Sequence, residues 1–168
     1  MQYATATVLL TRYDAQEIAQ RVAREIPRLV TGELLAAVAA AADLSDYTNE
    51  EAAQAAVAMI KVDTALKDAA DTIDSYISSR YILPLSPVPP VLERVACELA
   101  RYFLYDDQVT DVIKQRYDDC IKLLSNVQAG KVKLGADGET GDEPASGGAP
   151  EVVSAGRVWA RGNSTGFL

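Results

Sequence analysis

The sequence predicts an all-α fold: a small helical bundle with one long helix, a proline-rich connector, a helical hairpin and an extended C-terminal tail. Much of the 49% hydrophobic content is alanine, which is the strongest helix former. From 50 to 80 the chain contains neither glycine nor proline, and its apolar residues recur at helical spacing. A length of 168 residues suits one compact core.

The N-terminal part of the chain predicts three short helices separated by breaks. Segment 5–24 predicts two helices that meet near Asp14, whose carboxylate caps the second. Pro27 ends this pattern because proline lacks an amide hydrogen. Residues 31–42 predict an alanine-rich third helix, and 43–49 predict a polar connection.

A long helix is predicted over 50–80. Thr48 is followed three residues later by Glu51, which is a capping-box arrangement at the helix start. About 30 residues at ~1.5 Å each extend roughly 45 Å, which is more than a small domain needs for its own core. We therefore expect part of this helix to pack on a neighbouring subunit.

A connector and a helical hairpin follow. Segment 81–90 contains four prolines and predicts a stiff connector, whose last two prolines start the next helix. That helix is predicted to run to about 106. A last helix begins at Thr110 or Asp111 and ends near Gly130, where a glycine cap belongs. Its predicted apolar residues are Val112, Ile113, Tyr117, Ile121, Leu124 and Val127.

The composition changes after residue 135. Residues 1–135 predict the helical domain, and 136–150 contain no large apolar side chain, which predicts a flexible linker. Residues 151–168 regain apolar and aromatic side chains but are too few to form a core. We expect this tail to dock on other protein subunits. Its expected contact residues are Arg157, Val158, Trp159, Arg161, Phe167 and Leu168.

The composition argues against an enzyme. The chain has no histidine, which removes the commonest general base and metal ligand. Cys97 and Cys120 lie too far apart for a zinc motif, so we expect buried free thiols. The adjacent pairs Asp106-Asp107 and Asp118-Asp119 make poor chelates, because neighbouring helical residues point in different directions. We expect no catalytic residue, no metal and no cofactor.

The charge is acidic and uneven. A net charge of −8 disfavours a phosphate-binding surface, so nucleic acid is not the expected ligand. Eight acidic residues between Asp43 and Asp74 face only Lys61 and Lys67. The simpler interpretation is one solvated acidic helix face. The alternative is a surface that repels passing DNA, with Asp63, Asp68, Asp71 and Asp74 facing a channel.

Membrane insertion and secretion are not expected. No apolar run approaches the ~20 residues that span a bilayer, and the N-terminus shows no signal-peptide pattern. The sequence predicts a soluble protein made in the cytosol, with no membrane partner.

Several segments resemble the Mu-like phage neck protein family. Three of them read Ile73-Asp-Ser-Tyr-Ile-Ser-Ser-Arg-Tyr-Ile-Leu-Pro-Leu85, Val88-Pro-Pro-Val-Leu92 and Ala96-Cys-Glu-Leu-Ala-Arg-Tyr-Phe-Leu-Tyr-Asp-Asp107. Further similar stretches are Arg116-Tyr-Asp-Asp119, Ala129-Gly-Lys-Val-Lys-Leu-Gly135 and Arg157-Val-Trp-Ala-Arg161. The resemblance implies a helical head-tail connector or head-completion subunit without catalytic residues.

The resemblance also implies partners and a location. A ring of twelve copies is expected beneath the portal protein of a tailed phage, where it links the DNA-filled head to a tail-side neck or tail-terminator protein. DNA would pass through the ring without specific binding, and the chain would be found in the virion neck and, during assembly, in the host cytoplasm. The alternative is a transient cytosolic scaffold or assembly chaperone that is absent from the finished virion.

Overall fold

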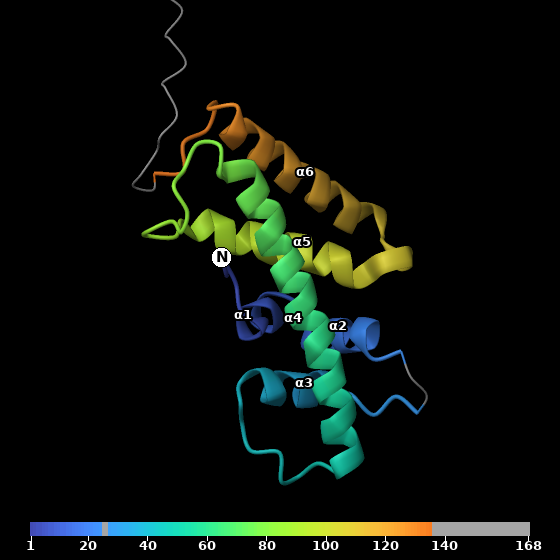
Figure 1. Ribbon diagram of the computed structural model, residues 1–168. Helices are drawn as coiled ribbons and strands as arrows, with labels where there is room; N and C mark the ends of the chain where they lie inside the picture. Colours follow the sequence, from blue (N-terminus) through green and yellow to red (C-terminus); the bar gives the residue numbers. More distant parts are fainter. Residues whose placement is uncertain (25–26, 136–168) are drawn as a thin grey trace, which may run out of the picture.

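The computed structural model describes residues 1–24 and 27–135, and this part of the chain is a helical bundle (Figure 1). Six α-helices and one short 3₁₀ helix form here, and these residues contain no strand. The predicted all-α class is therefore confirmed. The elements are α1 Ala6–Arg12, α2 Ala15–Val22, α3 Gly32–Ala39, α4 Asn49–Ile77, α5 Pro90–Tyr105, the 3₁₀ helix η1 Asp106–Gln108, and α6 Asp111–Gln128.

Side-chain caps explain where α2 and α4 begin. The Asp14 carboxylate accepts a hydrogen bond of 2.9 Å from the backbone N–H of Gln16, as predicted. The predicted capping box is also present, because Thr48 accepts from the N–H of Glu51 while Glu51 accepts from the N–H of Thr48. Each cap stabilises its helix by about 1 kcal/mol, because it satisfies amide groups that have no partner within the helix.

Helix α3 is shorter than the predicted helix over 31–42. It ends at Ala39, and Ala41 has a φ of 52°, in the left-handed region. The N–H of Ala42 donates to the Ala37 carbonyl and the N–H of Ala41 donates to the Val38 carbonyl, which is the hydrogen-bond pattern of a glycine-type helix end. An alanine occupies the position that normally favours glycine, so the stop has no sequence signal.

Helix α4 is the axis of the bundle and contacts every other α-helix in the described residues. In Figure 1 its first half lies against α1, α2 and α3, and its second half crosses α5 and α6. Small side chains such as Ala55, Ala58 and Ala69 are buried on it and let the neighbouring helices approach closely. The largest fully buried side chains are Leu9, Ile18, Leu34, Leu35, Val62, Ile73, Ile77, Leu92, Val95, Leu99, Leu124 and Val127.

The connector and hairpin follow the prediction. Pro90 is the first residue of α5, and η1 joins α5 to α6. Gly130 has a φ of 72° just beyond α6, and a Cβ there would lie 2.5 Å from Nη1 of Arg80. The Tyr81 hydroxyl accepts a 2.9 Å hydrogen bond from the N–H of Leu134. These contacts place residue 135 near the C-terminal end of α4.

One predicted apolar contact on α6 is wrong. Val112 is 60% exposed, whereas Ile113 next to it is buried. Consecutive helical residues point ~100° apart, so only one of the two can face α5 and the core. The predicted linker over 136–150 and the predicted tail over 151–168 lie outside the described residues.

Candidate interaction surface

Helix α4 carries a second apolar stripe that faces away from the core. Its exposed residues Ala53, Val57, Ile60 and Thr64 follow one another at intervals of four, three and four. Val57 is 49% exposed and Ile60 is 64% exposed. This spacing is typical of a seam that packs against another segment. We call these four residues the outer seam.

The outer seam changes the interpretation of the sequence pattern. Ile60 belongs to the apolar residues that recur at helical spacing between 50 and 80, yet it points to solvent, and the core position is taken by Val62. Large exposed apolar side chains at regular spacing mark interaction surfaces more often than isolated ones do. The expectation that part of α4 packs on a neighbouring subunit stays a prediction, and the seam gives it a location.

The four aspartates of the channel hypothesis have different surroundings on α4. Asp63 and Asp71 line one depression beside the N-terminus. Asp68 lines a different depression. It follows Asp63 by five residues, so the two side chains point ~140° apart around the helix. Asp74 accepts a 2.7 Å hydrogen bond from the Met1 amino group and another from the Tyr3 hydroxyl. Asp63, Asp71 and Asp74 therefore lie within ~80° of one another around α4, whereas Asp68 lies farther round the helix.

The depression that includes Asp68 lies between α2, α4 and α5, and we call it the α2–α4–α5 pocket. Its volume is about 400 Å³, which is large enough for a bulky side chain. Apolar groups of all three helices line it, and charged groups lie among them. The lining residues are Arg21, Val22, Arg24, Ile60, Lys61, Thr64, Ala65, Asp68, Phe103, Leu104 and Asp106. Ile60 therefore belongs to both the pocket and the outer seam.

The three cations of the α2–α4–α5 pocket already have partners. The Arg21 guanidinium stacks over the Tyr105 ring at 4.4 Å and donates to the side chain of Gln108 at 2.6 Å. Arg24 pairs with Asp107 at 3.2 Å, and the Lys61 ammonium donates to the carbonyl at the C-terminal end of α2 at 2.8 Å. By contrast, the pocket carboxylates of Asp68 and Asp106 form no ion pair within residues 1–24 and 27–135.

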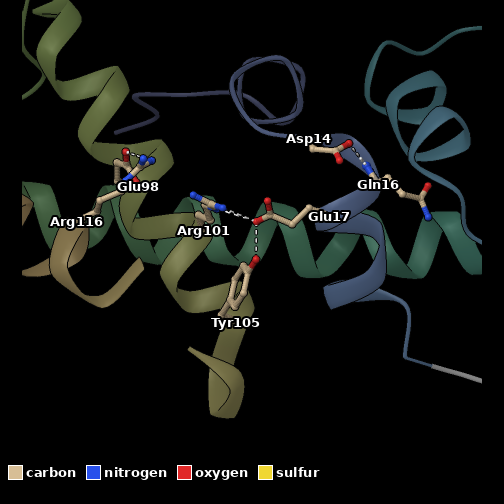
Figure 2. Close-up of polar contacts among 7 residues, drawn as sticks. All are labelled: Asp14, Gln16, Glu17, Glu98, Arg101, Tyr105 and Arg116. Atoms are coloured by element: carbon tan, nitrogen blue, oxygen red, sulfur yellow. Dashed lines mark hydrogen bonds and ion pairs between the residues drawn. The ribbon is translucent and has the colours of Figure 1, made fainter. Parts of the chain in front are cut away.

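A polar clamp fixes the walls of this pocket. Figure 2 shows Glu17 on α2 pointing toward Arg101 and Tyr105 on α5. One oxygen of Glu17 accepts from Nε and Nη2 of Arg101 at 2.9 and 2.7 Å, and from the Tyr105 hydroxyl at 2.6 Å. Burial and then the bond to Glu17 raise the pKa of Tyr105, so it stays a donor. The clamp holds α2 against α5.

Two arginines of the α5–α6 hairpin form ion pairs that join helices. Arg101 pairs with Glu17, and Arg116 on α6 pairs with Glu98 on α5 at 3.5 Å (Figure 2). Their partners are glutamates of α2 and α5 rather than the acidic residues of α4. The helix hairpin is thus joined by an ion pair as well as by its apolar face.

The thiols are buried and unpaired, as predicted. Burial raises the pKa of Cys97 and of Cys120 to about 11, which keeps both thiols neutral and unreactive. Within the described part of the chain, no group of three or more acidic, histidine or cysteine side chains is arranged to hold a metal ion. None of the helices there is both long and apolar enough to cross a membrane.

The predicted tail contacts Arg157, Val158, Trp159, Arg161, Phe167 and Leu168 lie outside the described residues, so the structure does not test them. Sequence reasoning missed the α2–α4–α5 pocket, because its lining comes from three segments that only the fold brings together. The outer seam had a signal: Val57 and Ile60 add apolar positions on a side of the helix away from the buried stripe.

Comparison with known proteins agrees with the resemblance in the sequence. The chain matches the family described as Bacteriophage Mu, Gp36, over residues 3–153. It is 48% identical over 108 residues to the Mu-like prophage FluMu protein gp36 of Haemophilus influenzae, which covers 64% of this chain and 76% of that protein. It is 35% identical over 104 residues to gene product J of Escherichia phage Mu, covering 62% and 73%. The chain therefore belongs to the bacteriophage Mu Gp36 family.

Proposed function

We propose that this phage protein is a structural head-tail connector, which forms a ring beneath the portal and links the DNA-filled head to the tail. The outer seam of α4 carries the proposal. A subunit that works in a ring needs a surface for its neighbour, and Val57 and Ile60 supply exposed apolar contacts on the longest, most rigid element. The role requires no chemistry, and we propose none.

The ring requires that each copy contact two neighbours. In a cyclic assembly one patch of each subunit contacts a different patch of the next, and the ring closes when the rotation between neighbours is right. We propose the outer seam as one of these patches. Twelve copies is the number that the family resemblance implies. The tail over 151–168 is proposed to join subunits through its apolar and aromatic residues.

We propose that the portal protein lies on one side of this ring and a tail-side neck or tail-terminator protein on the other. DNA passes through the channel without specific binding. Of the four predicted channel residues, Asp63 and Asp71 remain suited to the channel wall, because they are exposed on the same side of α4. Acidic side chains there would repel the phosphate backbone and let DNA slide.

Two experiments test the proposal. Mass spectrometry of purified virions is expected to find the chain in the finished particle. Phage that lack the chain are expected to make full heads and separate tails that do not join. If the chain is absent from finished particles but is needed to make them, the scaffold or chaperone alternative replaces the connector.

The channel assignment has its own test. Changing Asp63 and Asp71 together to lysine is expected to slow DNA ejection, because two new cations per copy would attract the phosphate backbone. Ejection from purified particles is followed with a DNA-binding dye at two salt concentrations. Unchanged ejection at low salt would remove these two residues from the channel wall and leave the connector role untouched.

A further inference from the structure

The geometry points to a specific contact between copies: the α2–α4–α5 pocket of one copy binds the segment Arg157–Arg161 of a neighbouring copy, with Trp159 as the buried anchor. This inference rests on the proposed ring, and it identifies the surface that receives the tail. The sequence of the segment is Arg157-Val-Trp-Ala-Arg161. Three observations support the assignment: the size of the pocket, its charges and the reach of the chain.

The first observation is size and polarity. The pocket of about 400 Å³ has apolar walls from Ile60, Ala65 and Phe103. Aromatic anchors with a large apolar surface contribute most to protein interfaces, and they bind in pockets of this kind. Trp159 is the one tryptophan of the chain. The half-buried Phe103 ring offers it an aromatic wall.

The second observation is charge complementarity. Asp68 and Asp106 line the pocket and have no ion pair in the described residues, whereas the pocket cations are already bonded. Trp159 stands between two arginines, and these are the only cations in 136–168. Helix α4 itself carries six acidic and two basic residues. The segment therefore brings positive charge to a pocket whose unpaired groups are negative.

The third observation is reach. Residue 135 lies near the C-terminal end of α4, and Ile60 lies 17 residues before the last residue of that helix, which is ~25 Å along its axis. Fifteen residues such as 136–150 can span at most ~50 Å. A tether of this length reaches the pocket of an adjacent copy whose outer seam is packed nearby.

Photo-crosslinking in the full chain tests this inference. A benzophenone amino acid replaces Trp159, and purified virions and purified full-length chain are irradiated. We expect a covalent dimer whose crosslinked peptides carry Ile60, Asp68 or Phe103. A crosslink within one copy, a dimer joined at other residues, or a crosslink to a different protein would each overturn it.

A charge exchange provides a second readout that does not depend on the photo-label. Asp68→Arg is expected to reduce self-association about tenfold, because it places a cation opposite Arg157 and Arg161. Combining it with Arg157→Glu and Arg161→Glu is expected to restore association. The matched control is Asp118→Arg, on the exposed side of α6, which is expected to leave association unchanged.

The connector role and the assignment of the α2–α4–α5 pocket can be tested separately. If virions contain the chain and its loss stops head-tail joining, the connector role holds whatever the crosslinks show. If the exchange at Asp68 has no effect, or the same effect as the exchange at Asp118, only the pocket assignment is wrong. Circular dichroism verifies that each variant is folded. Both aspartates are exposed, so these substitutions are expected to leave the fold intact.

Discussion

At the scale of single residues, Glu17 shows how one carboxylate can position two helices. It collects donors from Arg101 and Tyr105 on α5, while Arg21 on the next turn of α2 stacks over the same tyrosine ring. The Glu17 and Arg101 side chains are only 27% and 14% exposed, so solvent screens this pair less than it screens a surface pair. The clamp is therefore expected to contribute measurably to stability.

Changing Glu17 to Gln is expected to lower the free energy of unfolding by about 2 kcal/mol, because it removes charge-assisted bonds and leaves Arg101 partly buried without its anion. Urea denaturation followed by circular dichroism measures this change. The control is Glu93→Gln, whose pair with Arg12 is 36% and 42% exposed, and which is expected to cost less than about 0.5 kcal/mol. Equal losses of unfolding free energy in the two variants would contradict the stabilising role of the Glu17 clamp.

The buried thiols predict a pH dependence at the alkaline end. Cys97 and Cys120 have pKa values of about 11 in the fold against a usual value of 9.0, because burial disfavours the thiolate. Because the pKa is raised in the fold, the unfolded chain loses these protons at lower pH than the folded chain does. The contribution of the neutral thiols to the free energy of unfolding is therefore fully present below pH ~9 and is lost as the pH rises to ~11. Tyr3 and Tyr13, whose pKa values burial also raises, add a further loss beginning near pH ~10.

Urea midpoints between about pH 8 and about pH 10 measure the thiol contribution. The stability of the native sequence is expected to fall over this range. A variant with both Cys97→Ala and Cys120→Ala is expected to start less stable, because it loses buried side-chain volume, and to show a much smaller fall. A fall of the same size in both proteins would show that other groups cause it.

At the scale of elements, the end of α3 is the least conventional feature. Ala41 takes a left-handed conformation that costs an L-residue about 1–2 kcal/mol and costs glycine almost nothing. Changing Ala41 to Gly is therefore expected to raise the free energy of unfolding by about 1 kcal/mol. The same substitution at Ala36, inside α3, is expected to lower it by about 1 kcal/mol. Two changes of the same sign would contradict the assigned helix end.

The same helix shows which features of elements a sequence reveals. Thr31 and Thr48 mark helix starts because a hydroxyl group there bonds to a free amide, and that chemistry is local. The end of α3 lies within an alanine run and is set by where the chain must turn back toward α4, so no local residue type marks it. Pro90 and Gly130, which act through their own backbone, were predicted at their positions.

At the scale of the whole molecule, the candidate site depends on assembly of the fold. The outer seam lies on one helix, so periodicity could have revealed it, but a helix with apolar residues on two sides resembles a fully buried one in sequence. The α2–α4–α5 pocket brings together residues from three segments between Arg21 and Asp106, so it has no local sequence pattern. Phe103 is a half-buried wall of this pocket.

The bundle separates folding from assembly, and this separation can be tested on α4. Ala55, Val62 and Ile73 face the core, whereas Val57 and Ile60 contact solvent. Changing Val57 and Ile60 together to aspartate is expected to alter the free energy of unfolding by less than about 0.5 kcal/mol per site, because no buried group is disturbed. The same change is expected to weaken self-association more than about tenfold and to prevent head-tail joining, because two charges would enter an apolar contact.

Val112 supplies the control for that experiment. It is exposed to nearly the same extent as Ile60, but it lies at the start of α6, away from the outer seam. Val112→Asp is expected to change neither stability nor association. Sedimentation velocity of the purified chains measures self-association. Infectivity of phage that carry each variant reports head-tail joining. If the seam variant assembles as well as the Val112 variant, then the exposed side of α4 does not join copies, and the connector would need another surface to form its ring.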